Sequence, residues 1–305
     1  MENMPISYSG DELLHITLMD GQARALLINS TMLCEQARAT HTLSNVASAA
    51  LGRLLTVSAM MGAMIKTAQG SITATIKGDG PLGALVAVAH EDLTVKGYVD
   101  KPRVETELRA DGKLDVGGAV GNGRLTVVKD LGMREPYVGQ VELVSGEIAN
   151  DFAYYFTVSE QQPTLLSLGV LMAPASAGEA HVISAGGLLV QPLPGCSEEV
   201  LSELEARASS YADISRQFVD HTPDELCQSF FAGLEPRIIE RRTPCFRCDC
   251  DEERIQRALI SLGREELQAM IDEDNGAQLE CHFCNRRYHF TGDELRELLR
   301  QATQA

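Results

Sequence analysis

Alternating apolar and polar positions predict β-strands over much of the N-terminal part of the chain. Residues 6–28 alternate around a Met-Asp-Gly turn at residues 19–21, which predicts a hairpin. Further stretches rich in Val, Ile and Thr, punctuated by Gly, predict short strands within residues 71–99, 123–131, 137–146, 164–174 and 181–194. The glycine-rich runs at residues 78–83 and 117–123 match neither G-x-G-x-x-G nor a phosphate-binding loop, so we interpret both as hairpin turns.

Helical patterns interrupt these strands without a strict β-α repeat. Residues 32–66 predict a long helix. Residues 145–161 predict a second one, capped by Ser145, with one apolar face made of Ile148, Phe152, Tyr155 and Phe156. The pattern predicts an α+β fold for residues 1–194, a large mixed sheet and helix domain, rather than a doubly wound one.

Residues 195–242 have the composition of a helical linker. Ser197 caps an acidic first turn, Thr222 to Glu225 form a capping box with Pro223 at the first helical position, and Gly233 ends that helix. The predicted helices are short and have modest apolar faces, so their stability depends on what they pack against. We therefore expect a metastable linker. The apolar positions concerned are Leu201, Leu204, Ile214, Phe218, Leu226, Phe230 and Phe231.

Residues 243–305 predict a small C-terminal domain with clear helix signals. Asp251 caps one helix that ends at Gly263, and a second helix follows up to Asn275-Gly276. A hairpin then leads to a capping box at residues 291–294 and a final helix. A domain of about sixty residues has too little core to be stable unaided, so a bound metal is physically motivated.

Composition and charge exclude several functional classes. The chain has 305 residues and a formal net charge of −17, which disfavours nucleic-acid and anionic-membrane partners. Arginines do gather near the C-terminal cysteines, and we interpret them as solvated surface: Arg237, Arg241, Arg242, Arg247, Arg286 and Arg287. The longest apolar run, residues 46–65, contains Arg53 and predicts a buried core helix rather than a membrane span. The N-terminal residues 1–14 resemble no secretory signal, so we expect a cytoplasmic protein.

Five of the eight cysteines lie close together in the sequence after residue 244. Cys34, Cys196 and Cys227 stand apart and are expected to be small buried hydrophobic residues. In a reducing compartment the clustered ones point to metal or redox chemistry, and four thiolates form a closed tetrahedral zinc site. Cys281-x-x-Cys284 has the usual spacing for one half of such a site. For the other half, spacing favours Cys245-x-x-Cys248, whereas Cys248-x-Cys250 remains stereochemically possible, and composition cannot decide between them.

The arrangement Cys248-x-Cys250, a gap of thirty residues, and Cys281-x-x-Cys284 resembles the 33-kDa redox-regulated heat-shock chaperonin family. The similarity extends to GDGPLGALVA, KDLGMREPYVGQVELVSGEIANDFAYYF, SEQQPT, GGLLVQPLP and ISLGREELQAMIDEDNGAQLECHFCNRRYHF, and so covers nearly the whole chain. The resemblance implies one zinc ion bound by those four cysteines, with Cys245 as an additional thiol outside the ligand set. It also implies disulfides Cys248–Cys250 and Cys281–Cys284 in the oxidised protein.

The resemblance also implies a function. The resemblance implies a chaperone that holds unfolding client proteins without ATP, is not an enzyme, has no catalytic or nucleotide-binding residues, and is a homodimer when active. Oxidation of zinc-bound thiolates would release the metal, unfold the C-terminal domain and linker, and expose apolar surface. A disulfide between Cys248 and Cys250 closes a very small ring, which favours ready reduction.

Two other functional classes use similar cysteines. A zinc-ribbon adaptor would bind nucleic acid or protein and keep its zinc under oxidation, and it would present basic or aromatic surface at the zinc knuckle. A thiol oxidoreductase would use Cys281-x-x-Cys284 at a helix N-terminus in a thioredoxin-like fold, which five clustered cysteines fit poorly. His282 and His289 are alternative metal ligands, but with four thiols at hand we interpret them as exposed hairpin residues.

Overall fold

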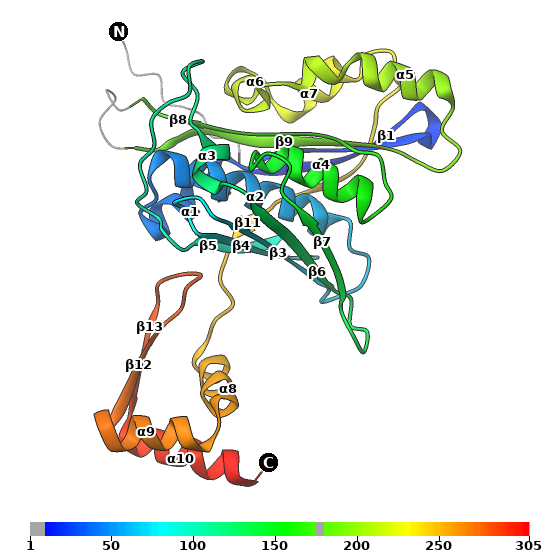
Figure 1. The fold of residues 1–305 in the computed structure, drawn as a ribbon. Coiled ribbons are helices and arrows are strands. Elements are labelled where there is room, and N and C mark those ends of the chain that lie inside the picture. The colour runs from blue at the N-terminus through cyan, green and yellow to red at the C-terminus, as the bar shows by residue number, and fades with distance from the viewer. Residues whose placement is uncertain (1–9, 175–179, 305) are drawn as a thin grey trace. The chain divides into compact units, whose positions relative to one another are not determined.

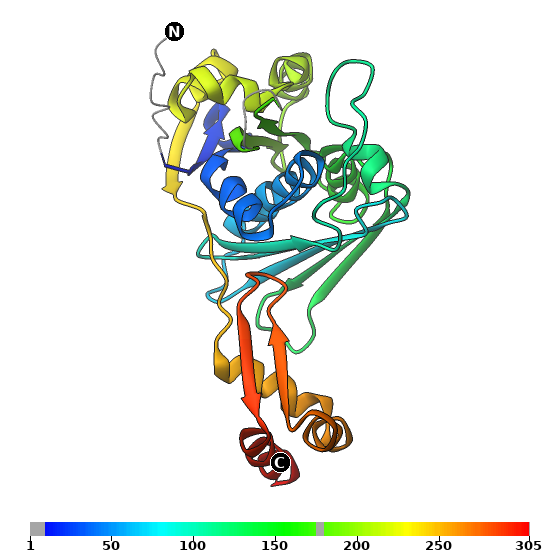
Figure 2. The same ribbon diagram turned by 90° about the vertical axis from the view of Figure 1, so that its left-hand side faces the viewer.

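The computed structural model describes residues 10–174 and 180–304. The chain divides into two compact units, Met1–Arg247 and Cys248–Ala305. Figures 1 and 2 show the two units in views that differ by a quarter turn. The first unit has a larger core built between two sheets, and the second is a hairpin with three helices.

The first sheet of the large unit has five strands in the order β10-β1-β2-β9-β8, and all neighbours are antiparallel. The predicted hairpin is confirmed within the described residues: its strands turn at residues 19–21, and its first strand starts at Glu12, whereas residues 6–9 lie outside the described part of the chain. The strand bounds are β1 Glu12–Leu18, β2 Ala23–Asn29, β8 Leu165–Met172, β9 Val182–Pro192 and β10 Arg237–Arg242.

The second sheet has six strands in the order β11-β5-β4-β3-β6-β7, antiparallel except for β11 and β5. Residues 78–83 form the predicted turn between β3 and β4. The turn predicted at residues 117–123 is wrong, because the Asp115 side chain accepts a hydrogen bond from Gly118 N and starts the short helix α3, Val116–Val120. The strand bounds are β3 Ser71–Gly78, β4 Ala84–His90, β5 Thr94–Val99, β6 Gly123–Asp130, β7 Tyr137–Glu142 and β11 Cys245–Phe246.

Helices fill the space between the two sheets (Figure 1). The single helix expected at residues 32–66 is two helices, α1 Thr31–His41 and α2 Asn45–Ala63, because Thr42 adopts a left-handed conformation and Ser44 caps α2. Helix α2 is long and apolar enough to span a membrane, but 89% of its apolar window is buried in the protein, as expected of a core helix.

Helix α4, Ile148–Val158, packs with the predicted apolar face inward. Its start differs from the prediction, because Glu147 rather than Ser145 is the N-cap residue. The buried carboxylate of Asp151 instead accepts hydrogen bonds from the backbone of Val144 and Ser145 and holds the preceding turn. Short polar side chains near a helix start are interchangeable in sequence, so their exact roles depend on the turn geometry.

The linker segment covers the outer face of the five-stranded sheet. Its helices are α5 Glu198–Ala206, a 3-10 turn at Ala208–Tyr211, α6 Ile214–Asp220 and α7 Pro223–Phe230. The caps at Ser197 and Thr222 and the left-handed Gly233 agree with the prediction. The last helix ends at Phe230, and residues 237–242, the end of the segment expected to be a helical linker, form the edge strand β10 against β1.

The small unit contains α8 Glu252–Leu262, α9 Arg264–Asp274, the hairpin β12 Gly276–Glu280 with β13 Arg287–Thr291, and α10 Gly292–Gln304. Asp251 caps α8 and Gly263 ends it, and Thr291 with Glu294 forms the predicted capping box. The turn of the hairpin lies at the end away from α9 and α10 (Figure 2). Among the described residues its buried core is small: Leu259, Leu267, Ile271, Phe290, Leu295 and Leu298.

Candidate metal centre

Two short segments bring four cysteines together in the small unit. Cys248 and Cys250 lie in the irregular stretch before α8. The start of α8 is fixed by its N-cap residue, Asp251, which accepts a hydrogen bond from Arg254 N at 2.7 Å. Cys281 and Cys284 lie in the turn between β12 and β13.

Backbone hydrogen bonds hold this turn in the shape of a metal knuckle. Cys281 N donates to Arg286 O at 2.9 Å, and the Cys281 carbonyl accepts from Cys284 N at 3.2 Å and from Asn285 N at 2.8 Å. Asn285 adopts φ 57°, a left-handed conformation that Asn tolerates better than most residues. These hydrogen bonds fix the turn that carries both thiols.

The four sulfurs form a compact group. Their atoms all lie within 4.8 Å of one another, with 3.8 Å between Cys248 and Cys281 and 3.3 Å between Cys250 and Cys284. With Zn–S bonds of about 2.3 Å, a tetrahedral site places its sulfurs about 3.8 Å apart. The group therefore fits a tetrahedral metal ion with little rearrangement, and the donor set is one that zinc favours.

Electrostatics also favours a cation at this position. Burial and the neighbouring thiols raise the pKa of Cys248. Burial opposes ionisation of Cys250 as well, but hydrogen bonds from the Tyr288 hydroxyl at 3.2 Å and from the adjacent thiols lower its pKa to about 7. Because neighbouring thiolates repel one another, all four can be ionised together only when a cation compensates their charge.

Cys245 belongs to a different part of the structure. It lies in β11, where its backbone N donates to Leu93 O at 3.0 Å and the strand pairs with Thr94 and Val95 of β5. The group of four thiols does not include it. Pairing of β11 with β5 thus makes Cys245 part of the large unit, whereas the small unit begins at Cys248, and no signal in the spacing of the cysteines indicates this.

The remaining cysteines and histidines agree largely with the predictions. Cys34 and Cys227 are buried, and burial raises the pKa of each thiol, to about 12 and about 11. Cys196 is only partly buried, with its sulfur 3.6 Å from Ser197 O. His282 and His289 are exposed.

The arginines near the cysteines are mostly paired with carboxylates. Arg241 contacts Asp224 at 2.5 Å and Glu12 at 3.2 Å, and Arg242 lies near Glu91. Further pairs are Arg237–Asp20, Arg247–Asp92 and Arg287–Glu280, whereas Arg286 donates to the Cys250 carbonyl. Their positive charge is therefore locally compensated, as the interpretation of a solvated surface requires.

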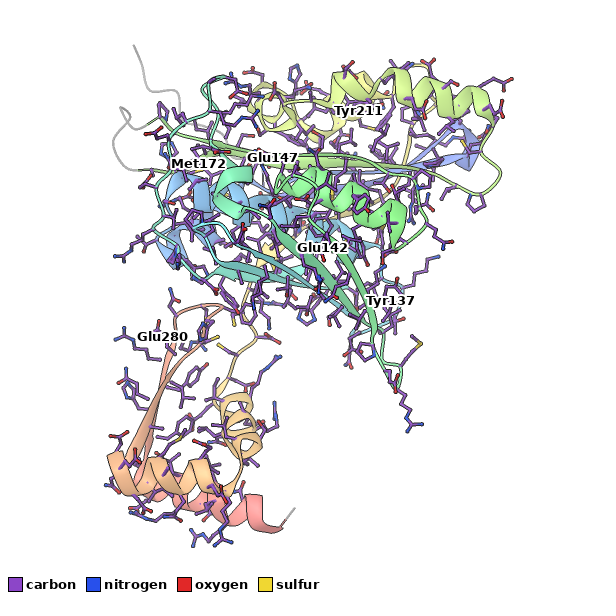
Figure 3. The ribbon with its side chains drawn as sticks, in the orientation of Figure 1. Tyr137, Glu142, Glu147, Met172, Tyr211 and Glu280 are labelled. Atoms are coloured by element: carbon purple, nitrogen blue, oxygen red, sulfur yellow. The ribbon has the colours of Figure 1, made fainter. Side chains whose placement is uncertain are left out.

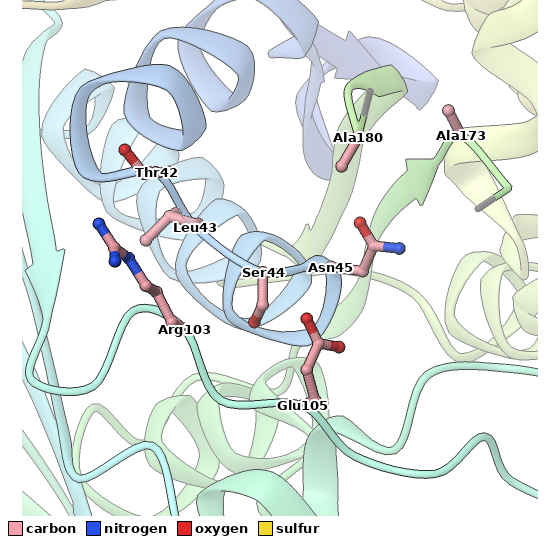
Figure 4. Close-up of a pocket in the computed structure, with 8 residues that line it drawn as sticks. All are labelled: Thr42, Leu43, Ser44, Asn45, Arg103, Glu105, Ala173 and Ala180. Carbon is pink, nitrogen blue, oxygen red and sulfur yellow. The ribbon is translucent and has the colours of Figure 1, made fainter. Parts of the chain in front are cut away.

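A surface pocket lies elsewhere in the large unit, at the turn between α1 and α2 (Figure 4). Arg103 and Glu105 are its charged lining residues, and Ala173 and Ala180 border residues 175–179, which the structure does not describe. None of the cysteines contributes to it. Its described lining residues form no constellation of catalytic groups.

The large unit also contains an apolar interface between the linker segment and the five-stranded sheet, which sequence patterns indicated only in part. One face of the five-stranded sheet contributes Leu14, Ile16, Leu18, Ala23, Ala25, Leu27, Leu188 and Val190. The linker segment contributes Val200, Leu204, Tyr211, Ile214, Phe218, Leu226, Cys227, Phe230, Phe231 and Leu234. The alternation in β1 and β2 predicted a hairpin, but it did not show that the linker covers one face of the sheet.

Comparison with known proteins decides the family. A family model described as Hsp33 protein matches residues 11–291, which include the four-cysteine group. The chain belongs to the Hsp33 family. It is therefore a redox-regulated holdase chaperone with a C-terminal four-cysteine cluster, and not an enzyme.

Relatives match over almost their full length. The chain is 44% identical to the 33 kDa chaperonin of Alkaliphilus metalliredigens over 289 residues, covering 94% of this chain and 98% of the relative. It is 45% identical to that of Oceanobacillus iheyensis over 291 residues, with 94% and 99% covered. The crystal structure of the Hsp33 homologue from Thermotoga maritima superposes with a TM-score of 0.86 at 36% identity, covering 96% and 99%. The α+β fold with a C-terminal four-cysteine cluster is thus the Hsp33 fold.

Proposed function

We propose that Cys248, Cys250, Cys281 and Cys284 bind one zinc ion in the reduced protein, and that their oxidation starts client binding. When bound, zinc would supply folding free energy to the small unit through four thiolate bonds. The convergence of four sulfurs within 4.8 Å is the observation that carries the proposal. The small core of six buried residues supports it, because such a unit needs an additional source of stability.

Oxidation removes the ligands in pairs. Cys248 would join Cys250 and Cys281 would join Cys284, and each new S–S bond releases two electrons from two thiolates. One peroxide molecule accepts these electrons with two protons and leaves as two water molecules. A disulfide sulfur carries no negative charge and binds zinc poorly, so the small unit would lose its metal and the stability that depends on it.

The chain connection supports a coupling between the small unit and the linker. Only Arg247 separates β11 from Cys248, and β10 directly precedes β11. Both strands pair at the edges of sheets, so they can detach without breaking a sheet apart. Loss of order in the small unit would therefore extend to the strands that anchor the linker from its C-terminal side.

Several contacts suggest that the linker is held only moderately. The ion pair Lys113–Asp213 joins it to the segment before α3, but both side chains are more than half exposed, so it adds little stability. The Tyr211 hydroxyl is buried and finds no hydrogen-bond partner among residues 10–174 and 180–304. An unsatisfied buried hydroxyl costs about 1–3 kcal/mol. Release of the linker would uncover the apolar sheet face, which is suited to bind unfolding proteins.

The family also supports three finer proposals. Clients would be proteins that are losing their structure, and holding would need no ATP. The active form would be a homodimer. The site of action would be the cytoplasm, where reducing conditions keep the thiols free until oxidative stress.

Two buried cysteines provide an internal test of linker release. Cys227 is a linker residue in α7 and is fully buried against the five-stranded sheet, whereas Cys34 is buried between the two sheets. After zinc is removed with a chelator under mild warming, we expect pulse alkylation of Cys227 to accelerate strongly while Cys34 stays protected. Mass spectrometry of the alkylated peptides measures both rates in one sample. Equal protection of both thiols in the zinc-free protein would refute the coupling.

A linker substitution should mimic part of the switch. Phe231 is fully buried, and its ring packs against Tyr211 with centroids 6.0 Å apart. Phe231→Ala removes about 3–5 kcal/mol of packing. We expect the reduced, zinc-loaded variant to suppress aggregation of a thermally unfolding test protein without peroxide. The matched control, Val219→Ala, alters a half-exposed side chain of α6 and should behave like the wild type. A Phe231→Ala protein that needs peroxide as much as the wild type would contradict the role of the linker.

A further inference from the structure

One sheet edge of the large unit differs from the others in being open. Of the edge strands in its two sheets, β10 consists mainly of charged residues, β11 has only two residues, and β8 has no exposed residue. Charge, short length or burial usually protects an edge strand, because its unpaired backbone N–H and C=O groups can otherwise pair with a strand of another chain. Strand β7 lacks these protections: Tyr137, Val138, Gln140 and Glu142 are exposed.

The register of β7 shows which backbone groups are available. Leu143 N donates to Gly123 O at 2.8 Å, so these opposite residues form a hydrogen-bonded pair just beyond the strand. In an antiparallel ladder hydrogen-bonded and non-hydrogen-bonded pairs alternate. Val141, Gly139 and Tyr137 therefore bond to β6, and the N–H and C=O groups of Val138, Gln140 and Glu142 point away from the sheet.

Apolar side chains accompany this edge. Val138 is 55% exposed and Tyr137 is 42% exposed. The Tyr137 hydroxyl donates to Ser159 O at 3.1 Å, which joins β7 to the end of α4, where Tyr154 and Val158 are also exposed. Figure 3 shows Tyr137 and Glu142 at opposite ends of the strand. Within residues 10–174 and 180–304, the edge thus offers both unpaired backbone groups and apolar surface.

We propose that the free edge of β7 binds extended segments of unfolding client proteins by adding them to the six-stranded sheet as a further strand. Strand addition obtains affinity from main-chain hydrogen bonds, so it tolerates many sequences. That tolerance suits a holdase, whose partners share an exposed backbone rather than a common motif. Successive strand residues lie on opposite faces of a sheet, so apolar residues at alternate positions of the client segment would contact Val138 on one face.

A second copy of this chain fits the edge less well. Each copy carries a net charge of −17, so two copies repel each other. Antiparallel self-pairing about Gln140 would also place Val138 opposite Glu142 of the other copy, an unfavourable combination. An unfolding client that is neutral or basic meets neither obstacle.

The proposal rests on client holding but not on oxidation, because β7 is exposed while the linker covers its own sheet face. The edge would provide a weak first contact in the reduced protein. After linker release the uncovered sheet face would add a second contact on the same client, and two linked contacts bind more tightly than either alone.

The test uses the full-length reduced protein and a fluorescent peptide of about ten residues that alternates Val and Lys. Val138→Pro removes the outward N–H and should leave the ladder with β6 intact, because proline is tolerated where an edge strand faces solvent. We expect peptide affinity to fall about tenfold, whereas Val138→Thr, which keeps the N–H, should change it by no more than about twofold. Unchanged peptide affinity in a folded Val138→Pro variant would overturn the proposal.

A second measurement covers the case in which Val138→Pro does not fold. A photo-crosslinking residue, p-benzoylphenylalanine, replaces Val138, or replaces Leu108 as an equally exposed control in another segment. Crosslinks to a thermally unfolding test protein should form from position 138 and not from position 108. Equal crosslinking from both positions, or crosslinks at 138 only between copies of the chaperone, would overturn the proposal.

The outcomes distinguish client binding at the β7 edge from activation of the chaperone by oxidation. If peroxide activates holding but neither the peptide nor the crosslinks depend on position 138, the switch stands and the edge proposal fails. If position 138 carries peptide binding but peroxide changes nothing, the edge proposal stands and the switch fails.

Discussion

Replacing Cys250 with Ser is expected to abolish stoichiometric zinc binding, whereas replacing Cys245 with Ser should leave one zinc ion per chain. Structural zinc sites contribute about 10–16 kcal/mol of apparent binding free energy at neutral pH, more than a small unit gains from its own core. Cys250 lies in the group of four thiols, and Cys245 is held in β11 of the large unit. The two substitutions are chemically identical and only five positions apart in the sequence.

Metal analysis and circular dichroism measure this contrast. The Cys250→Ser protein should lose the helical signal of α8, α9 and α10, because their six-residue core cannot hold them without metal. Cys196→Ser, which alters a partly buried thiol outside the group, provides a second control with unchanged zinc. Zinc loss on Cys245→Ser with full retention on Cys250→Ser would refute the proposed ligand set.

Helix ends were the most predictable part of the fold, because their signals are local. Ser197, Thr222, Asp251 and Thr291 all cap as the sequence predicts. In each case a side-chain oxygen accepts a hydrogen bond from the backbone N–H three residues further on, and no distant contact is needed. The break at Thr42 was missed, since a left-handed threonine carries no signal that distinguishes it from a helical one.

Strands that depend on distant partners were not predictable. Residues 237–242, Arg-Ile-Ile-Glu-Arg-Arg, have no apolar alternation, and they form β10 because the backbone of β1 is available for pairing. The two-residue strand β11 arises in the same way against β5. These pairings span more than 140 residues of sequence, and local propensity does not encode them.

The same contrast between local signals and distant contacts applies to the candidate metal centre. Cysteine spacing identified Cys281 and Cys284 as half of a site, because a short knuckle is a local structure. For the other half, spacing favoured Cys245 over Cys250 as the partner of Cys248, and the structure does not follow that preference, because β11 holds Cys245 in the large unit. Family resemblance pointed to Cys250, and the structure brings Cys250 rather than Cys245 into the group.

Oxidation is expected to convert a poor chaperone into an effective one. In the reduced protein the linker covers the apolar face of the five-stranded sheet. A client that buries three or four of the uncovered side chains would gain about 5–10 kcal/mol before the cost of association, so firm holding requires that the client covers more of this face. Holding should need no ATP, and it should fade when a dithiol reductant and zinc are restored.

The most direct test follows zinc release and client holding in the same sample during treatment with peroxide under mild warming. We expect that one zinc ion per chain is released, that unreduced peptides then contain Cys248–Cys250 and Cys281–Cys284, and that suppression of aggregation rises as the metal leaves. A zinc-ribbon adaptor would keep its metal, and an oxidoreductase would turn over a disulfide substrate. If the zinc-loaded reduced protein holds clients and the oxidised, zinc-free protein does not, the proposed switch is wrong.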